Sequence, residues 1–538
     1  MTVAERTQLM EHSDGYERRW WILGVLCLSL LVVGLDNTIL NVALPTLVRD
    51  LHASTSALQW LVDAYVLVFA GLLLTTGSLS DRFGRRYALA VGLVIFGVGS
   101  VFSAFAGSAN TLIATRSLMG VGGALIMPST LSILTNVFPA EERGRAIGIW
   151  AGVSGLGIAI GPIVGGWLLS HFWWGSVFLV NVPVVIVALV AGRLIVPNSK
   201  DPSPNALDPV GAILSIVGLV SLVYGIIEAP SHGWTSAQTL GTFAFAAIVL
   251  VLFAVWELRS DHPMLDVTFF ENPRFTAANI SIVLVFFALF GSLFFLTQYL
   301  QFVLGYSALQ AGIRIAPLAL MLMVGAPVAG RLTARFGNKG LVATGMTVVA
   351  IGLGYMGTLS VTSGYGHVVI SLVVLGLGMG LAMVPATESI MGSLPLAKAG
   401  VGSAMNDTTR QVGGALGVAI LGSIFASSYA AHIAGSLAGL PTAAVAAATN
   451  SVGSAIALGT KIGGSQGVAI TAAAKSSFIT AMDHGLVVAA LIALLGAIVA
   501  VVWLPNRVVV DAAAAGADPG RLEEGRVAAT VTTAVPVE

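Results

Sequence analysis

The most regular feature of the chain is a series of long apolar runs separated by short polar segments. A membrane-spanning helix needs about 20 mostly apolar residues, and fourteen runs of this kind can be counted. They lie close to 20–45, 57–79, 87–108, 111–135, 145–169, 174–196, 209–229, 238–258, 275–304, 309–331, 341–361, 366–391, 402–428 and 477–504. Alternating strands of about ten residues, the pattern of a membrane barrel, do not occur in the sequence. The pattern predicts an all-α integral membrane protein with 14 transmembrane helices.

The composition supports this prediction and excludes several other classes of protein. Hydrophobic residues make up 56% of the 538 residues and charged residues 9%, whereas soluble domains carry roughly 25% charged residues. Lys+Arg and Asp+Glu are equal at 25 each, and without a basic stripe nucleic-acid binding is excluded as a main activity. The single cysteine, Cys27, lies in an apolar run, and the eight histidines are scattered. We therefore expect neither disulfides nor a metal site.

Lysine and arginine are distributed unevenly between the predicted loops. If the N-terminus is cytoplasmic, most of the 25 Lys and Arg residues fall in cytoplasmic loops and tails, with Arg82, Arg85 and Arg86 together in one loop. Cytoplasmic loops of membrane proteins carry such an excess of positive charge. The distribution predicts an even number of spans with both termini in the cytoplasm.

An eight-residue motif occurs twice, 253 residues apart. Residues 77–84 read GSLSDRFG and residues 330–337 read GRLTARFG, and each follows a predicted span on the cytoplasmic side. The match implies two parallel halves of six helices, an arrangement that secondary transporters use. The alternative is a generic basic turn that recurs by convergence.

The repeat divides the chain into five segments. They are a cytoplasmic N-terminal segment (1–19), an N-terminal six-helix bundle (20–196), two inserted transmembrane helices with their linkers (197–274), a C-terminal six-helix bundle (275–504) and a cytoplasmic tail (505–538). Within the C-terminal bundle, the connection 429–475 is expected outside the cell. Its richness in Ala, Gly, Ser and Thr fits a mobile loop as well as a re-entrant or interfacial segment.

Three ionisable side chains lie inside predicted spans of the N-terminal half. Asp36 in the first span, Asp63 in the second and Arg116 in the fourth are expected at similar depth, and each costs roughly 2.5–3.5 kcal/mol on insertion scales. One Asp–Arg pair could merely neutralise itself, but this leaves the second carboxylate unexplained. Because burial and a nearby arginine act on a carboxylate in opposite directions, such a group can load and lose a proton near neutral pH. We interpret the three residues as proton-coupling residues.

The C-terminal half holds weaker candidates for proton coupling. Glu388 lies near the cytoplasmic end of the twelfth predicted span, and Asp407 lies at the start of the thirteenth, three residues before Arg410. Since residues i and i+3 share a helix face, Asp407 and Arg410 could instead form a simple interfacial pair. Arg314 in the tenth span has no acidic neighbour in the sequence that accounts for it.

The fifth predicted span carries a row of glycines. Gly157, Gly161 and Gly165 recur every four residues and therefore form a groove that a neighbouring helix can approach closely. Pro162, within this groove, removes one backbone hydrogen bond and favours a kink. The pattern indicates either a hinge or ordinary helix packing.

Taken together, these stretches resemble the major facilitator superfamily, and within it the fourteen-span drug:proton antiporters of the QacA/EmrB type. Residues 77–89 (GSLSDRFGRRYAL) are similar to the superfamily's loop signature, and residues 35–45 (LDNTILNVALP) to the family's first-span signature. Residues 112–124 (LIATRSLMGVGGA) are similar to the fourth-span signature and residues 157–166 (GIAIGPIVGG) to the fifth-span antiporter signature. The resemblance covers about 18–505, and Ala334 departs from it because the loop signature has an acidic residue there.

The resemblance implies a proton-coupled secondary active exporter of amphipathic, often cationic, compounds that works by alternating access. Its place would be the bacterial cytoplasmic (inner) membrane, its partners small-molecule substrates, protons and membrane lipids, and its cofactors none, with protons as the coupling ion. A monomer would suffice. Side chains expected to line an adaptable pocket, each of which could instead serve packing or an interfacial belt, are Asp63, Asn37, Asn41, Trp60, Tyr65, Gln298, Tyr299 and Gln301. Residues expected in conformational gating are Gly77, Asp81, Arg82, Gly84, Arg85, Gly157, Gly161, Pro162 and Gly165.

Other function classes fit the sequence less well. A channel favours a continuous polar pore, a membrane enzyme needs a paired nucleophile and base, and ATP-driven transport needs a phosphate-binding loop that the sequence lacks. We expect no enzyme activity. The alternative that remains is a proton-coupled permease or exporter of an endogenous metabolite or lipid-like compound, and the sequence does not identify the substrate.

Overall fold

The computed structural model describes residues 16–200, 207–394 and 399–505. Every regular element in this part of the chain is a helix, as the apolar runs predict. Thirteen of these helical segments are long and apolar enough to cross a membrane. The span expected at 145–169 falls in the helix Ala140–His171, which is not one of the thirteen. The total of fourteen spans therefore stays a prediction.

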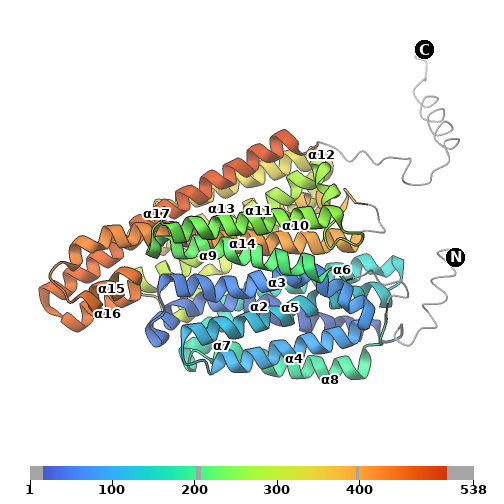
Figure 1. Cartoon of the computed structure of the whole chain (residues 1–538), viewed down its shortest axis with the longest axis horizontal. Helices are drawn as coiled ribbons and strands as arrows, with labels where there is room; N and C mark the ends of the chain where they lie inside the picture. The colour runs from blue at the N-terminus through green and yellow to red at the C-terminus, as the bar shows by residue number, and fades with distance from the viewer. Residues whose placement is uncertain (1–15, 201–206, 395–398, 506–538) are drawn as a thin grey trace, which may run out of the picture.

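The N-terminal helices form one bundle, coloured blue to cyan in Figure 1. Its members are α2 (Arg19–Leu51), α3 (Thr55–Phe83), α4 (Arg85–Ala104), α5 (Ala109–Val137), α6 (Ala140–His171), α7 (Ser176–Leu179) and α8 (Asn181–Ile195). Within it α5 packs on α3 and α4, and α2 packs on α6. Serine side chains cap the first free backbone N–H groups of two members, with Ser54 before α3 and Ser108 before α5.

The C-terminal helices form the second bundle, and of an inserted pair one helix, α9 (Pro209–His232), runs along the boundary between the two bundles (Figure 1). The bundle consists of α11 (Pro273–Gln298), α12 (Ala308–Gly357), α13 (Tyr365–Met391), α14 (Ala399–Ile433) and α17 (Gly464–Trp503), and the inserted pair of α9 (Pro209–His232) and α10 (Ala237–Arg259). The helix α9 packs against α10, against α3 of the first bundle and against α14 of the second.

The two copies of the eight-residue motif share a backbone feature. Gly84 ends α3 with φ +114°, and Gly337 kinks α12 with φ +75°. Both values lie in the left-handed region, which glycine adopts without a steric penalty. At this kink α12 divides into two segments that are each long enough to cross a membrane, Ala308–Thr333 and Arg335–Gly357, and these correspond to the predicted spans 309–331 and 341–361. The positive φ shared at equivalent positions favours an internal repeat over convergence.

The connection 429–475, for which the sequence leaves open a mobile loop or a re-entrant or interfacial segment, is largely helical. The helix α14 continues to Ile433, α17 begins at Gly464, and between them lie a short 3-10 turn, α15 (Thr442–Asn450) and α16 (Val452–Ile462). Figure 1 shows α15 and α16 in orange at one tip of the molecule. The helices α14 and α17 are longer than the predicted spans 402–428 and 477–504. The sequence did not reveal these extensions because runs of small residues such as Ala and Gly have little hydropathy contrast.

Consecutive helices run antiparallel, so the arginines of several connections share one end of the molecule. We call the end that carries Arg82, Arg85 and Arg86 the arginine-rich end, and the other the opposite end. At the arginine-rich end, Arg19 of α2 donates hydrogen bonds of 2.7 and 3.1 Å to the carboxylate of Glu142 in α6. These bonds lower the pKa of Glu142, which therefore stays charged at neutral pH.

Candidate functional site

The first site residue, Asp36, lies midway along α2 and forms a buried ion pair with Arg116 of α5. Arg116 Nη1 donates a hydrogen bond to Asp36 Oδ2, and Arg116 Nε donates one of 3.2 Å to the carbonyl of Leu61 in α3. The exposed fractions of the two side chains are 2% and 0% for Arg116 and Asp36. The guanidinium also lies 4.4 Å from the centroid of the Tyr65 ring, a favourable cation–π geometry. Three helices thus meet at one pair of opposite charges.

Asp36 also has a partner that the sequence analysis missed. The side-chain amide of Asn181 lies at the start of α8 and donates to Asp36 Oδ1 and to Ser100 Oγ of α4, each at 3.3 Å. Asn181 is the amide residue in a predicted span, 174–196, that is otherwise mostly apolar. An isolated amide of this kind in an apolar run is the signal that could have identified it.

The second carboxylate, Asp63, is buried without a partner. Its side chain is 0% exposed, and neither oxygen has a hydrogen-bond partner in the part of the chain that the structure describes. It lies one helical turn after Gln59, which donates from Nε2 to the carbonyls of Val418 and Ala419 in α14 at 3.2 and 2.9 Å. Residues i and i+4 share a helix face, so Asp63 lies on the side of α3 that faces the other bundle. A charge there needs neutralisation by a proton or a cation, because an unpaired buried charge is costly.

The glycine groove of α6 holds the helix that carries Asp36. A Cβ added at Gly157, Gly161 or Gly165 would approach backbone atoms of α2 within 3.0–3.2 Å, around Leu35 and Ile39. Contacts this short leave no room for a larger residue. The groove therefore sets how closely α6 and α2 approach each other next to the buried ion pair.

A different side of α6 contacts the C-terminal bundle. A Cβ at Gly166 would come within 2.6 Å of Leu309 Cα in α12, and a Cβ at Gly312 in α12 would meet the Pro162 carbonyl. The helix α6 thus lies directly between α2 and the other bundle at the opposite end.

Hydrogen bonds between the two bundles gather at the opposite end. Besides Gln59, Gln301 Nε2 donates to the Val42 carbonyl in α2 at 2.9 Å, and Thr55 Oγ1 donates to the Asn450 carbonyl in α15 at 2.9 Å. These contacts close this end of the interface between the bundles. The role of Gln59 as a bridge was not foreseen, because its partners are backbone carbonyls some 360 residues away in the sequence.

The two asparagines among the predicted pocket residues present free polar atoms near Asp36. The Oδ1 atoms of Asn37 and Asn41 are buried, and neither has a hydrogen-bond partner within the described residues. Both follow Asp36 along α2, so acceptors are available within about one and a half helical turns of the ion pair.

The other predicted pocket residues are engaged elsewhere. Trp60 lies 6.1 Å from Tyr224 of α9, and Gln298 donates to a carbonyl of its own helix at 2.9 Å. Tyr299 donates to the Ser360 carbonyl at 2.9 Å, and the Tyr65 ring lies under the Arg116 guanidinium, while the buried Tyr65 hydroxyl has no hydrogen-bond partner among the described residues.

The acidic candidates of the C-terminal half differ in their surroundings. Asp407 is 8% exposed, and its Oδ1 lies 3.7 Å from Arg410 Nη1, as their spacing predicts. Arg410 Nη2 also donates to Thr387 Oγ1 in α13 at 3.4 Å. Glu388 is exposed in the last turn of α13, at the arginine-rich end. Its role in proton coupling stays a prediction.

Arg314, which the sequence left without an account, lies between two aromatic rings. Its guanidinium carbon is 3.9 Å from the centroid of Tyr306 and 5.1 Å from that of Tyr365. Its Nη1 donates to the Gln310 carbonyl at 3.3 Å. Cation–π contacts thus replace the acidic neighbour that the sequence does not provide.

The loop after α3 is held within its own bundle. Arg85 Nε donates to Asp81 Oδ1 at 2.7 Å, and the Arg85 backbone N–H donates to the Ser199 carbonyl at 3.0 Å. A Cβ at Gly84 would come within 2.8 Å of Asn198 Oδ1, so the left-handed turn and the close approach both require glycine. The partner of Asp81 in this conformation is therefore local.

Two other residues expected in gating, Arg82 and Gly77, have neighbours within the N-terminal bundle. The Arg82 guanidinium lies 5.9 Å from the ring of its neighbour Phe83, and a Cβ at Gly77 would have ordinary contact with Pro128 of α5. Neither residue contacts the C-terminal bundle through these neighbours.

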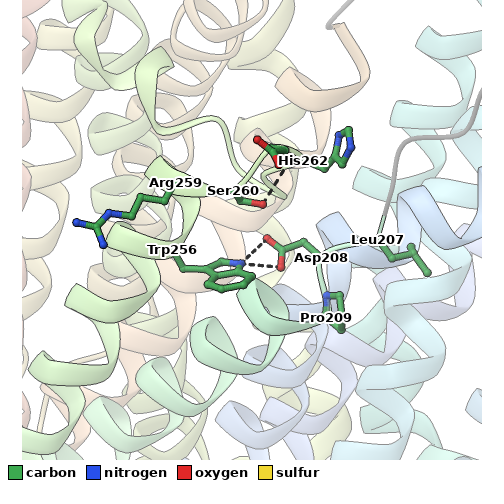
Figure 2. Close-up of a pocket in the computed structure, with 8 residues that line it drawn as sticks. Leu207, Asp208, Pro209, Trp256, Arg259, Ser260 and His262 are labelled. Atoms are coloured by element: carbon green, nitrogen blue, oxygen red, sulfur yellow. Dashed lines mark hydrogen bonds between the residues drawn. The ribbon is translucent and has the colours of Figure 1, made fainter.

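A separate pocket of about 350 Å³ lies between the ends of the inserted helices at the arginine-rich end. Figure 2 shows Trp256 donating to the Asp208 carboxylate beside it; the two hydrogen bonds are 2.9 and 3.1 Å long. The pocket is lined by residues of α9, α10 and their flanks alone, and none of the predicted site residues lies in it. Among the described residues, no group of three or more His, Cys, Asp or Glu could hold a metal ion.

Comparison with known proteins adds independent information. The family model described as Major Facilitator Superfamily matches residues 26–418. The chain is 39% identical over 411 residues to a tetracenomycin C resistance and export protein of Streptomyces glaucescens, covering 76% of each chain. It is 38% identical over 487 residues to a multidrug efflux pump of Mycolicibacterium smegmatis, covering 90% of this chain and 95% of the pump. A bacterial homologue of the human lysosomal transporter Spinster has the same fold, with a TM-score of 0.65 and 20% identity over 92% of this chain and 99% of the homologue.

Proposed function

The chain belongs to the major facilitator superfamily, and from this premise we propose that it exports amphipathic, often cationic, drugs in exchange for protons. It is a multi-pass membrane transporter and not an enzyme. Export as the direction of transport is supported by the relatives, whose names describe export and efflux of drugs. We place the arginine-rich end in the cytoplasm, because basic residues are retained on that side of the membrane.

The observation that carries the proposal is the unpartnered carboxylate of Asp63. It is fully buried on the face of α3 that turns toward the other bundle, and its oxygens have no hydrogen-bond partner among the described residues. Such a carboxylate accepts either a proton or a cationic substrate, but not both. Antiport requires this mutual exclusion, because each ligand shifts the transporter only by its different affinity for its two states.

The distribution of contacts between the bundles supports an inward-facing state. Gln59, Gln301 and Thr55 bond across the bundles at the opposite end, which closes the outer side. Alternating access would break these bonds and form new contacts at the arginine-rich end.

We assign Asp36 and Arg116 to the coupling of protons to this movement. Protonation of Asp36 would weaken its ion pair with Arg116, which connects α2, α3 and α5. Because the glycine groove of α6 fixes α2 and another side of α6 contacts α12, a shift of α2 would reach the interface between the bundles. The position of Asp81 fits a latch that is open in this state and closes onto the opposite bundle in the other.

The test uses purified protein in liposomes with an imposed proton gradient. Addition of ethidium to the wild-type protein should cause dye accumulation driven by the gradient, together with counterflow of protons. The Asp63→Asn variant should lose both signals. The matched control is Asp261→Asn, which removes an exposed carboxylate in the connection after α10 and should behave as wild type. Gradient-independent dye movement in the wild type would contradict the proposal.

A further inference from the structure

The two bundles meet along two seams, and the inserted helices lie over one of them. One seam runs between α3 and α14, and the other between α6 and α12. The helix α9 packs on both α3 and α14, so it lies over the first seam.

Side chains of α9 fill the first seam at several levels. A Cβ added at Gly71 in α3 would collide with Ile216 of α9, and the rings of Trp60 and Tyr224 lie 6.1 Å apart. On the other bundle, Ser423 Oγ of α14 donates to the Ile226 carbonyl of α9 at 2.7 Å. The helix is therefore in direct contact with both bundles.

The cover continues to the arginine-rich end. There, Thr75 Oγ1 of α3 donates to Met264 Sδ in the connection after α10, at 3.0 Å. The side of α3 that faces this seam is buried along its length, with exposed fractions of 0% for Asp63, 3% for Val66 and 2% for Ala70. Lipid cannot reach Asp63 through this seam.

The second seam is tight at the opposite end and opens toward the arginine-rich end. Gly166 of α6 and Gly312 of α12 mark the tight part, where an added Cβ would meet backbone of the other helix. Gly148 precedes Gly166 by 18 residues and Gly330 follows Gly312 by 18, which is five helical turns in each case. Each therefore lies on the same helix face as its partner, yet a Cβ at either position has no atom within 4 Å. The two helices diverge along this face.

Side chains between these levels are exposed. Met323 lies 11 residues after Gly312, about three turns further along the same face of α12, and is 56% exposed. On α6, Gly152 lies 14 residues before Gly166, about four turns along the same face, and an added Cβ there has no atom within 4 Å. No inserted helix packs against α6 or α12 among the described contacts.

Resting on the proposed function, we propose that the inserted pair seals the α3/α14 seam, so that amphipathic cations dissolved in the cytoplasmic leaflet enter through the α6/α12 seam. The lining of that seam is apolar and suits the alkyl or aromatic part of such a molecule. Directly behind it, α6 carries the groove that holds α2. The cationic part of the molecule is attracted by Asp63, the buried carboxylate without a hydrogen-bond partner among the described residues. Water-soluble cations instead reach the interior from the aqueous side of the arginine-rich end.

Transport of two viologens separates these routes in proteoliposomes. Heptyl viologen partitions into the bilayer, whereas methyl viologen, with the same dication, stays in water. Gly152→Trp, which fills the α6/α12 opening, should lower the initial rate for heptyl viologen by about tenfold and leave that for methyl viologen within about twofold. Met323→Trp fills the opening from α12 and should act alike. The control Val251→Trp adds the same side chain to an exposed position of α10 and should change neither rate. Equal loss for both viologens, or no loss for heptyl viologen, overturns the inference.

A labelling measurement tests the seal without any transport. In a Cys27→Ser background, Met323→Cys should react readily with N-(1-pyrenyl)maleimide dissolved in the bilayer, and Ala70→Cys on the covered face of α3 should react slowly. Equal rates would refute the seal. A wild-type protein that moves neither viologen would contradict the proposed function, while the labelling result would still decide whether one seam alone is open to lipid.

Discussion

The structure makes a quantitative prediction for Asp36→Asn, which removes one charge of the buried ion pair. Removal of one partner of a buried pair destabilises a protein by about 3–5 kcal/mol, because the other charge is left uncompensated. Arg116 would keep its hydrogen bond to the Leu61 carbonyl and its contact with the Tyr65 ring, and a desolvated cation–π contact is worth about 2 kcal/mol. The amide oxygen of the introduced asparagine could still accept a hydrogen bond. We therefore expect the lower limit, about 3 kcal/mol.

Unfolding can be followed through the single thiol of the chain. Cys27 is 8% exposed in α2, so a thiol-reactive fluorophore reports heating-induced exposure in detergent. Asp36→Asn should lower the unfolding midpoint clearly. Asp63→Asn should hardly change it, because Asp63 has no partner among the described residues that the substitution would leave as an unpaired charge. The double variant Asp36→Asn with Arg116→Gln should recover most of the stability, since neither charge remains.

Transport must respond differently from stability if Asp36 couples protons. Asp36→Asn and the double variant should both lack efflux driven by a pH gradient, although only the first is unstable. Wild-type stability of Asp36→Asn would refute the energetic reasoning, and pH-driven efflux by the double variant would refute the coupling role.

Three further outcomes are expected. Asp63→Asn should weaken export of cationic, especially divalent, compounds more than that of neutral ones, which vesicle efflux with matched substrates measures; equal losses would indicate a structural role. Asp81→Asn removes the negative charge that pairs with Arg85 at 2.7 Å and should slow turnover and shift spin-label distances across the arginine-rich end; unchanged distances and turnover would make Asp81 an ordinary loop charge. Gly161→Leu should cost about 1–3 kcal/mol through overpacking against α2, whereas Gly241→Leu, where an added Cβ has no atom within 4 Å, should not; similar thermal midpoints would contradict the groove.

Much of the fold was predictable because membrane insertion depends on local composition. The length of an apolar run decides whether it can span the bilayer, so the runs at 20–45 and 57–79 predict α2 and α3 without knowledge of their neighbours. The repeat was predictable as well: Gly84 and Gly337 occupy the same place in the two copies of the eight-residue motif, and both have a positive φ. For the connection 429–475 the sequence left a mobile loop and a re-entrant or interfacial segment open, because weakly apolar Ala and Gly runs do not reveal whether they form helices; the structure has α15 and α16 there.

The site was predictable only in part. Asp36, Asp63 and Arg116 stand out in the sequence because a charged side chain inside an apolar run is costly and points to a function. The sequence leaves open which aspartate pairs with the arginine. Packing of α2 against α5 decides that Asp36 is the partner. Tertiary packing also brings Asn181, 145 residues further along the chain, into contact with Asp36. No local sequence pattern contains this contact.

The position of the inserted helices depended wholly on tertiary structure. From the sequence, 209–229 and 238–258 are two apolar runs like the others. Whether they stand apart in the lipid or cover a seam depends on which side chains fit against α3 and α14, such as Ile216 over Gly71. Sequence thus determined which segments enter the membrane, because water and lipid act on each segment alone. Structure decided which charge is paired and which seam is closed, because these depend on shape complementarity between helices far apart in the chain.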